Sequence, residues 1–450
     1  MPTIILPVET AARELDAKLL LAVFLARAGL GVIIGSHARI NNRMHKLNAD
    51  AYVSQTIVKA KRRLFGIIRA RGMRLAAWDE EGMVWPSPEF YRARRLDAEN
   101  WAMLDRFLAW GGQQAGVIRE AFPGAARKLR LSGNPRQDLY TARMARMHDT
   151  AVGKIRAEYG RMILINSNFG SLHHARQPHV GLKKTRQDLQ RLAAVSRHRV
   201  EYLEARYRVF RTFCELLPAL AEEFPDHTVL IRPHPSENPA AWEELAAPYA
   251  NVVVRYDHEL IPWLMAAEVV IHNGCTTALE AAMLGTPVID FRAVETPNWE
   301  SPQPRAVSIP ATSPQEVIGL IRAPERLQQE KAAIEPALRE IFHGWGEGLA
   351  CERITEELLS LLAEPAPSVS SGKKMLAGLK SRVRAVEKSV VGRLMPTKSA
   401  NPDYIDRKFP PMMVDEARER LGQLAELAGL PAPVIKELGD RIWQVAPADN

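Results

Sequence analysis

The chain has 450 residues, of which 46% are hydrophobic and 25% are charged, and its formal net charge is +8. These proportions are typical of a folded globular protein and exclude a largely disordered chain, while the length corresponds to about two or three domains. The three cysteines lie far apart without a metal-ligand spacing, which favours a reducing compartment. Because no run of about 18 apolar residues is present and the first residues lack a charged leader, we expect a cytoplasmic protein.

The first part of the chain alternates short apolar strands with helices. The predicted strands are residues 3–6, 31–34, 51–54, 73–78, 107–110 and 128–131. The predicted helices are residues 11–28, a basic helix that ends near residue 70, and a helix after Gly112. Such alternation indicates a parallel sheet covered by helices on both faces. We therefore expect a first Rossmann-like domain over residues 1–145.

A second series of strands and helices begins after a helical bridge at residues 136–159. Its predicted strands are residues 162–165, 228–231, 252–254, 269–272 and 287–291. Its predicted helices are residues 189–223, 261–267, 277–284 and 314–363. These elements predict a second Rossmann-like domain over residues 146–362. The expected fold class is α/β, with two Rossmann-like domains that face a cleft and a C-terminal helical extension.

The C-terminal part of the chain has a different composition. A Pro- and Ser-rich linker is expected at residues 363–372, followed by a basic segment at 373–398. The last part, residues 399–450, is predicted to form a pair of helices at 414–428 and 431–443.

The basic segment has the pattern of an amphipathic helix. Its apolar residues recur at steps of three or four and form one stripe: Leu376, Leu379, Val383, Val386, Val390 and Leu394. Its basic residues fall mostly off that stripe: Lys374, Lys380, Arg382, Arg384, Lys388 and Arg393. We predict that this helix binds an anionic membrane surface, and nucleic acid is not an expected partner. The alternatives are that the stripe docks on the protein body, or that the basic face is only solvated.

The strongest local signal for a binding site is the segment VVIHNGCTTALEAAMLGTPVIDF at residues 269–291. A buried strand ends near Gly274 and a helix begins at Thr276 or Thr277, so free backbone N–H groups and two hydroxyls could hold a phosphate. The predicted phosphate-binding residues are Asn273, Gly274, Thr276 and Thr277. Glu280, one turn into the helix, could reach ribose hydroxyls. The alternative is a capping box, in which Thr276 caps the helix and Glu280 completes the motif.

A second signal is the Arg-Pro-His-Pro segment at residues 232–235, which follows a predicted strand. Ligands of open α/β sheets bind at the carboxyl ends of the strands, where Arg232 and His234 could neutralise a diphosphate. The alternative is a rigid surface turn. Asn168, in a polar loop after the first strand of the second half, could line the same cleft or only turn the chain. Three interpretations of the turn at residues 133–138 stay open: a hinge, a local Arg136–Asp138 pair, or a cap for the helix that follows.

Acidic residues follow two strands of the first half and are candidates for a general base or nucleophile. The candidates are Asp79, Glu80, Glu81, Glu9, Glu14 and Asp16. The group at 79–81 is preferred because Trp78 and Trp85 flank it and aromatic rings commonly stack on sugars. The alternative is that each acid only stabilises a helix start. Neither a metal site nor a GxGxxG turn is present in the sequence, so we expect no cofactor and no nicotinamide chemistry.

Together these motifs resemble the bacterial surface carbohydrate biosynthesis protein family, from about residue 3 to residue 360. The motifs that carry the resemblance are PVE at 7–9, RELD at 13–16, DEEG at 79–82, GNPR at 133–136, NFG at 168–170, RPHP at 232–235 and HNGCTT at 272–277. The segment EAAMLGTPVI at 280–289 also resembles the donor motif of GT-B glycosyltransferases and nucleotide-sugar 2-epimerases. The resemblance implies a GT-B-type fold.

The family is similar in turn to CMP-sugar-dependent transferases, including retaining Kdo transferases, which carry a His-Pro motif. This similarity implies that His234 contacts the donor phosphate and that Thr276 and Thr277 bind it from the helix start. Retaining Kdo transferases place an aspartate nucleophile beyond an early strand of their C-terminal half, whereas residues 166–170 here hold no carboxylate. Donor identity and stereochemistry therefore stay open.

The resulting prediction is a GT-B-type glycosyltransferase that uses a nucleotide-sugar donor, CMP-linked donors included, and a glycan or lipid-linked acceptor in surface polysaccharide or glycolipid synthesis. We expect it in the cytoplasm or at the inner face of the cytoplasmic membrane. One alternative is a nucleotide-sugar 2-epimerase or hydrolase on the same fold. The other is a non-catalytic scaffold that binds a nucleotide-sugar.

Overall fold

A computed structural model describes residues 1–174, 197–255, 259–296, 300–394 and 401–448. The chain forms two compact units. Domain 1 consists of residues 1–83, 88–147 and 339–450, and domain 2 consists of residues 84–87 and 148–338. The expected boundary near residue 145 agrees with this division, but the second boundary lies near 338 and not at 362. Among the described residues, no helix combines the length and the apolar character that a bilayer crossing requires.

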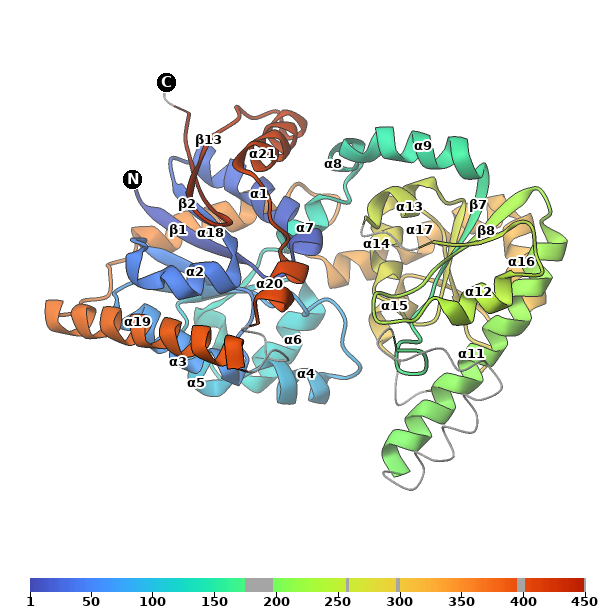
Figure 1. Cartoon of the computed structure of the whole chain (residues 1–450), viewed down its shortest axis with the longest axis horizontal. Helices are drawn as coiled ribbons and strands as arrows, with labels where there is room; N and C mark the ends of the chain where they lie inside the picture. Colours follow the sequence, from blue (N-terminus) through green and yellow to red (C-terminus); the bar gives the residue numbers. More distant parts are fainter. Residues whose placement is uncertain (175–196, 256–258, 297–299, 395–400, 449–450) are drawn as a thin grey trace. The chain divides into compact units, whose positions relative to one another are not determined.

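Domain 1 contains an eight-stranded sheet with helices on its faces (Figure 1). In spatial order its strands are β13 (Val434–Gly439), β14 (Ile442–Ala446), β2 (Gly31–Ser36), β1 (Thr3–Val8), β3 (Ala51–Ser54), β4 (Arg74–Ala77), β5 (Arg106–Ala109) and β6 (Leu129–Leu131). The six strands from the first part of the chain are parallel, as the alternating pattern predicted, whereas β14 pairs with β2 in the antiparallel direction.

The helices of domain 1 come from both ends of the chain. They are α1 (Ala11–Arg27), α2 (His37–Arg43), α3 (Arg62–Ala70), α4 (Pro88–Arg95), α5 (Ala98–Met103), α6 (Gly112–Ala121), α7 (Pro135–Asp138), α8 (Ala142–Ala145), α18 (Ala350–Ala363), α19 (Ser371–Leu394), α20 (Pro402–Lys408) and α21 (Val414–Ala428). Short 3-10 turns include η1 (Met44–Lys46) and η2 (Lys59–Lys61).

Helix α1 explains why the second boundary differs from the predicted one. Its leucines are buried on several faces, and they share one core with residues of α18 and α21. An apolar helix needs cover on every apolar face, and the C-terminal helices supply that cover. The chain therefore returns to domain 1 before α18, so that residues 339–362 belong with the N-terminal half.

Domain 2 contains a six-stranded parallel sheet. In spatial order its strands are β12 (Ile309–Ala311), β11 (Val288–Phe291), β10 (Val269–His272), β7 (Arg161–Asn166), β8 (His227–Arg232) and β9 (Val252–Val254). Its helices are α9 (Asp149–Tyr159), α11 (Arg197–Glu223), α12 (Ala240–Ala246), α13 (Ile261–Ala266), α14 (Thr277–Leu284), α15 (Pro302–Ala306), α16 (Pro314–Arg322) and α17 (Pro324–Ile341), the last of which ends in domain 1. The strand β12 was not predicted, and the predicted helix at 189–196 lies outside the described residues.

The predicted helix at residues 431–443 is wrong. This stretch forms the hairpin of β13 and β14, in which Ile435, Ile442, Trp443 and Val445 are buried. The strand β13 ends at Gly439, which has a φ of 155°, directly before the turn at residues 440–441. The spacing of these apolar residues is compatible with a strand as well as with a helix. The strand forms because it pairs with the edge of β2, which would otherwise be open.

The predicted basic amphipathic helix is α19, which lies against α2, α3 and η1 (Figure 1). The side that faces the protein body includes Ala377 and Ser381, each 2% exposed. The apolar residues of the opposite side are 47–78% exposed: Met375, Leu376, Leu379, Val383, Val386 and Val390. The stripe is therefore not docked on the body of domain 1. The side chains of Arg393 and Leu394 lie outside the described residues, as do residues 395–398.

Candidate functional site

Four neighbouring strands of domain 2 bring polar residues into one row at their carboxyl ends. The register pairs Arg232 of β8 with Asn166 of β7, Asn166 with His272 of β10, and His272 with Asp290 of β11. The predicted His-Pro loop and the predicted phosphate loop thus leave the same edge of one sheet, with β7 between them. Adjacent strands are about 4.8 Å apart, so the two loops begin about 10 Å from each other.

The turn that follows β10 is built around the imidazole of His272. This side chain is fully buried, and its Nδ1 accepts hydrogen bonds from the N–H groups of Gly274 at 2.9 Å and Cys275 at 3.4 Å. Its Nε2 lies 2.8 Å from the hydroxyl of Ser308. Burial lowers the pKa of His272, which favours the neutral ring that these contacts require. Gly274 has a φ of 83°, a left-handed conformation that other residues rarely adopt.

The same turn presents polar groups without a protein partner. Both side-chain atoms of the Asn273 amide and the hydroxyl of Thr277 are buried, and none has a hydrogen-bond partner among the described residues. Thr276 precedes α14 but its side chain makes no cap hydrogen bond. The capping-box alternative is therefore not formed through Thr276. Since buried polar groups are nearly always satisfied, Asn273 and Thr277 point to a ligand.

A small cavity adjoins this turn and is lined by cationic side chains. Its lining includes Asn273, Gly274, Arg206 of α11, Arg292 after β11, and Arg305 of α15. These arginines have local partners: Arg292 pairs with Asp290 at 2.5 Å, and Arg305 pairs with Glu300 at 3.0 Å. The cavity thus combines amide, hydroxyl and guanidinium donors, which together suit a phosphate-bearing ligand.

Glu237 organises the neighbouring loops, and the sequence pattern did not single it out. Its buried carboxylate accepts hydrogen bonds from Ser167 Oγ at 2.9 Å, Phe169 N at 2.8 Å, His234 N at 3.1 Å and Trp242 Nε1 at 2.9 Å. One carboxylate therefore fixes the loop after β7 to the loop after β8. Its only signal in the sequence is its position three residues after His234 in the His-Pro motif.

His234 is exposed and its ring is held by a local contact. Its Nδ1 lies 2.8 Å from Ser236 Oγ and accepts from the N–H of Ser236 at 3.1 Å. Burial of part of the ring lowers the pKa of His234, although the charge of Glu237 opposes this shift. Asn168 lies in the facing loop, where its carbonyl accepts a hydrogen bond from Arg206. The rigid-turn alternative and the binding role are thus compatible, because the turn fixes an exposed imidazole at the sheet edge.

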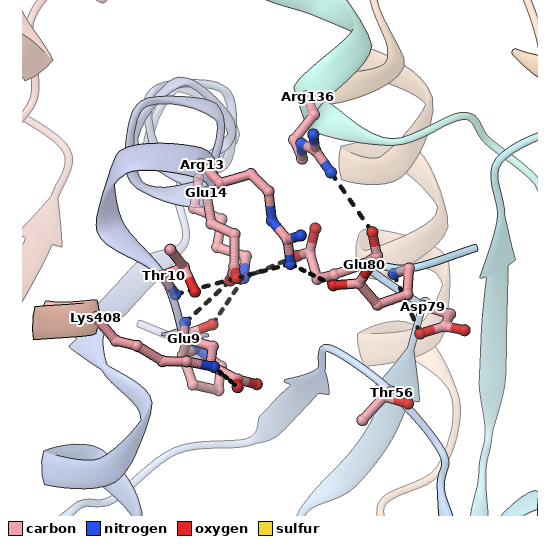
Figure 2. Close-up of polar contacts among 12 residues, drawn as sticks. Glu9, Thr10, Arg13, Glu14, Thr56, Asp79, Glu80, Arg136 and Lys408 are labelled. Carbon is pink, nitrogen blue, oxygen red and sulfur yellow. Dashed lines mark hydrogen bonds and ion pairs between the residues drawn. The ribbon is translucent and has the colours of Figure 1, made fainter. Parts of the chain in front are cut away.

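Most of the acidic candidates of domain 1, Glu9, Glu14, Asp79 and Glu80 among them, form a network after β1 and β4 (Figure 2). Its centre is Lys18, which is buried and whose Nζ lies 2.7 Å from Glu14, 2.9 Å from Glu80 and 2.8 Å from the carbonyl of Pro7. The charges of Glu14 and Glu80 outweigh burial, which acts in the opposite direction, and raise the pKa of Lys18. Lys18 was not predicted, because a lysine within the apolar pattern of α1 gives no sign of what it meets.

Glu14 and Asp79 serve as buried anchors. Glu14 accepts hydrogen bonds from the N–H groups of Glu9 at 3.0 Å and Thr10 at 3.1 Å, at the start of α1. This is the helix-start role that was its alternative interpretation. Asp79 accepts a hydrogen bond from Arg95 Nε at 3.0 Å. Burial raises the pKa of Asp79, and Arg95 acts in the opposite direction.

The remaining acidic candidates are more accessible. Glu81 pairs with Arg13 at 2.6 Å, and its side chain is 50% exposed. Burial acts to raise the pKa of Glu81, but the charge and hydrogen bond of Arg13 lower it. Glu9 pairs with Lys408 at 2.5 Å, and Asp16 pairs with Arg420 at 3.2 Å. Both of these cations come from the C-terminal helices, which the sequence did not connect to this edge.

The Gly-Asn-Pro turn connects α7 to α18 within domain 1. Asn134 caps α7 through a hydrogen bond from Arg136 N at 3.0 Å. The carboxylate of Asp138 accepts from Ala350 N at 2.7 Å and Cys351 N at 2.8 Å. Asp138 therefore caps α18.

The described residues contain no group of three or more histidine, cysteine, aspartate or glutamate side chains arranged to hold a metal ion. Arg232 donates a hydrogen bond to the carbonyl of Glu259 at 3.1 Å, and Glu280 is buried in α14. The cavity of domain 2 therefore combines neutral donors and arginines with the carboxylates of Asp290 and Glu300.

Comparison with known proteins finds similar solved structures but no match in sequence. No protein-family model and no curated protein matches the chain. The wall teichoic acid polymerase TagF aligns with 81% of this chain and 89% of its own, at 9% identity and a TM-score of 0.51. A UDP-GlcNAc 2-epimerase from Neisseria meningitidis aligns with 80% of this chain and 100% of its own, at 15% identity and a TM-score of 0.47. The likeness to TagF shows the fold, which is that of a GT-B-type protein with two Rossmann-like domains.

Proposed function

We propose that this protein is a GT-B-type glycosyltransferase that transfers a sugar from a nucleotide-sugar donor in surface polysaccharide or glycolipid synthesis. The observation that carries the proposal is the turn after β10, where buried polar groups of Asn273 and Thr277 have no hydrogen-bond partner among the described residues. Beside this turn lies a cavity whose lining includes three arginines. Such a turn at the carboxyl edge of a parallel sheet is suited to the phosphates of a nucleotide.

The donor would contact both loops of that edge. Asn273, Gly274, Thr276 and Thr277 bind its phosphates, with Arg232, His234 and Asn168 on the neighbouring loops. Glu280 binds the ribose. A diphosphate or a CMP-linked sugar fits this arrangement in chemical terms, since both present anionic oxygens to N–H and guanidinium donors.

The variant Asn273→Ala provides a direct test of donor binding. A structural asparagine stabilises the fold through its hydrogen bonds, whereas this amide makes none with the described residues. We expect nucleotide affinity to fall about tenfold, equivalent to one lost hydrogen bond of about 1.4 kcal/mol, while the melting temperature stays the same or rises. The measurement is a thermal-shift screen of CMP, UDP, GDP and CDP, followed by calorimetry. An unchanged affinity together with a lower melting temperature would reject the donor site.

The acceptor side is assigned to domain 1, with a carboxylate as general base. Among the six acidic candidates we favour Glu81, because its half-exposed carboxylate is accessible. Glu14, Asp79 and Glu80 are buried in ion pairs that stabilise the same edge, so their substitution should unfold domain 1 as well as lower activity. Glu81→Gln should lower the rate of transfer at saturating donor by about a hundredfold without a change in unfolding.

The class of reaction is decided by nucleotide release with and without an acceptor. Transfer releases nucleotide only when an acceptor is present, whereas a hydrolase releases it from the donor alone. An epimerase changes the donor sugar without the need for an acceptor, and a scaffold binds the donor without any reaction. The expected result is acceptor-dependent release.

We further propose that the protein works at an anionic membrane surface through α19. The exposed stripe of this helix adjoins exposed cations, among them Lys373, Lys380 and Arg382, and a stripe of this kind suits a bilayer that carries negative charge. Helix α19 packs on domain 1 through the side opposite the stripe, so the stripe itself stays exposed. A lipid-linked acceptor would then lie within reach of the enzyme.

Co-sedimentation with vesicles tests the attachment. The wild-type protein should pellet with phosphatidylglycerol vesicles at low salt and be released at high salt, because screening weakens surface charge interactions. The double variant Val383→Glu, Val386→Glu should stay in solution. Leu359→Glu on α18 changes an exposed leucine elsewhere in domain 1 and should pellet like the wild type. Equal pelleting of all three proteins would contradict a role for the stripe.

A further inference from the structure

A cluster of cations lies under α19 at the carboxyl edge of the domain 1 sheet. His37 directly follows β2, Lys61 ends the turn η2 after β3, and Arg384 and Lys388 come from the inner side of α19. We define these four residues as the cation cluster. All four residues are intermediate in exposure.

The central contact of the cation cluster joins two basic side chains. Lys61 Nζ lies 2.8 Å from His37 Nε2, so the imidazole accepts the hydrogen bond and is neutral. Burial, followed by the charges of Lys61, Lys388 and Arg384, lowers the pKa of His37 well below its usual value. The three remaining members are therefore the charged groups of the cluster.

Among the described residues, no carboxylate forms an ion pair with a charged member of the cation cluster. Within the described parts of the chain, Lys61, Arg384 and Lys388 form no ion pair, whereas the nearby acids are already engaged. Glu9 pairs with Lys408 at 2.5 Å, and Glu387 pairs with Arg63 at 2.5 Å. Burial lowers the pKa of Lys61 to about 8, with Glu9 acting against this shift, and burial with the charge of Arg384 lowers that of Lys388 to about 8.

Unpaired cations that are partly removed from water are costly to the fold. An anion bound between them removes this cost, and a phosphate can accept hydrogen bonds from all three side chains at once. The same helix presents its apolar stripe on the opposite side. One element therefore joins a surface suited to lipid chains and a polar cluster suited to an anion, as a phosphorylated lipid would require.

We propose that the cation cluster binds a phosphate group of the acceptor, and that the acceptor is a sugar or polymer attached to a lipid through phosphate. This inference rests on the proposed glycosyltransferase function, because it identifies the acceptor of that reaction. Lys61, Arg384 and Lys388 bind the phosphate oxygens, and His37 holds Lys61 in position. The lipid would extend past α19 toward the bilayer.

The test measures the binding of inorganic pyrophosphate and of geranyl phosphate to the full-length protein by calorimetry, without vesicles and with the proposed donor site of domain 2 saturated by nucleotide. The double variant Arg384→Gln, Lys388→Gln removes two charges from the inner side of α19. The double variant Lys373→Gln, Lys380→Gln removes two charges from its exposed positions and is the matched control. We expect the first variant to weaken both ligands at least about tenfold, and the control to bind them like the wild type. Circular dichroism verifies that each variant is folded.

Two results would overturn the proposal. Equal losses in the two variants would show that general positive charge, and not the cation cluster, attracts the anion. Wild-type affinity for both ligands in the first variant, combined with weaker binding to phosphatidylglycerol vesicles, would assign Arg384 and Lys388 to bilayer headgroups.

Nucleotide binding separates this inference from the proposed function. If both double variants bind nucleotide like the wild type, while only the first loses pyrophosphate, the acceptor-phosphate site is supported independently of the donor site. If the wild type binds nucleotide and transfers sugar but binds neither phosphate ligand, the inference fails and the proposed function stands.

Discussion

At the scale of single residues, several buried carboxylates stabilise loops of this protein. Asp138 caps α18 from a position 212 residues earlier in the chain, and Glu237 joins two loops of domain 2. A carboxylate can accept several hydrogen bonds at once, so that it fixes backbone segments which share no regular structure. Because Glu237 joins two predicted binding loops, its structural and binding roles are best separated by stability and binding measurements on the same variant.

Asp138 should give the stability of the protein a defined pH dependence. Burial raises its pKa from 3.8 to about 6, although the N–H groups of Cys351 and Ala350 act to lower it. Between these values the folded state holds a proton that the unfolded state has released, so this contribution to stability is present at low pH and is lost as the pH rises through 6. Asp138→Asn should remove about 2 kcal/mol of that dependence.

Urea unfolding at several pH values between 4 and 7 measures this effect. The exposed Asp226 provides a control, since Asp226→Asn should follow the wild-type profile. Parallel profiles for wild type and Asp138→Asn would show that the buried carboxylate titrates in the ordinary range.

Glu237→Gln should destabilise domain 2 and weaken nucleotide binding together. The glutamine places an NH2 group among donors that include Ser167 Oγ, Phe169 N and Trp242 Nε1, so that donors face donors. We expect a loss of about 3 kcal/mol in the free energy of unfolding. The exposed Glu243→Gln on the adjacent helix should change neither property, and a stable Glu237→Gln protein would contradict the anchoring role.

The candidate site was only partly predictable at this scale. Gly274 and the prolines around His234 determine local backbone shape, so the sequence itself indicates where those loops turn. The cation cluster was not predictable, because Arg384 and Lys388 meet His37 only after α19 has docked on α2. Contacts between residues more than 300 positions apart leave no local pattern.

At the scale of elements, the hairpin of β13 and β14 depends on close backbone approach. Gly35 of β2 has a φ of 149°, and a Cβ atom there would lie 2.1 Å from the carbonyl oxygen of Arg441. That oxygen accepts a hydrogen bond from Ser36 N at 2.9 Å, which fixes the start of β14 beside the end of β2. The edge strand therefore requires glycine at this position.

Gly35→Ala should destabilise domain 1 by about 2–3 kcal/mol, because the added methyl group meets backbone and the conformation is unfavourable for alanine. Gly66→Ala is the control: it lies in α3, no atom lies within 4 Å of its added Cβ, and alanine favours the helix by about 1 kcal/mol. Thermal unfolding of the two variants should shift in opposite directions. A neutral Gly35→Ala variant would show that β14 can move away from β2.

The amphipathic segment shows what periodicity can and cannot predict about an element. The spacing of Leu379, Val383 and Val386 predicted one apolar face, and the helix was found over residues 371–394. The usual reading, in which an apolar face packs on the core, is wrong for this helix. Small side chains, Ala377 and Ser381, permit close packing on α2 and α3, and this close approach selects the docked side.

At the scale of the whole molecule, the parallel strands of both sheets were predicted, whereas the antiparallel strands β13 and β14 and the second domain boundary were not. Alternating strands and helices determine a parallel α/β fold through local patterns, and the structure confirms this fold class. The membership of α18, α21 and β14 in domain 1 depends on which surface is left uncovered by the first 147 residues. The uncovered surface exists only in the folded domain, so the amino-acid composition of the C-terminal segments does not predict that they cover it.

A truncation after Leu430 should therefore affect domain 1 and leave domain 2 intact. Loss of β13 and β14 exposes the edge of β2 and uncovers the apolar core that Trp443 and Val445 share with α1. Such an edge promotes association between chains. We expect aggregation by light scattering and faster hydrogen exchange in residues 31–36, with unchanged protection of residues 269–291. Uniform loss of protection in both domains would contradict this prediction.

The discontinuous make-up of domain 1 has a consequence for synthesis on the ribosome. Residues 148–338 emerge as one continuous stretch, so that domain 2 can fold while the first 147 residues still wait for their covering helices and edge strand. The nascent protein must keep the open edge of β2 and the bare side of α1 from self-association until residues 442–446 have been translated. A pause in translation shortly before residues 442–446 should therefore reduce the yield of folded protein more than an equal pause within the segment that encodes domain 2. Depletion of chaperones that shield apolar surfaces should increase this loss.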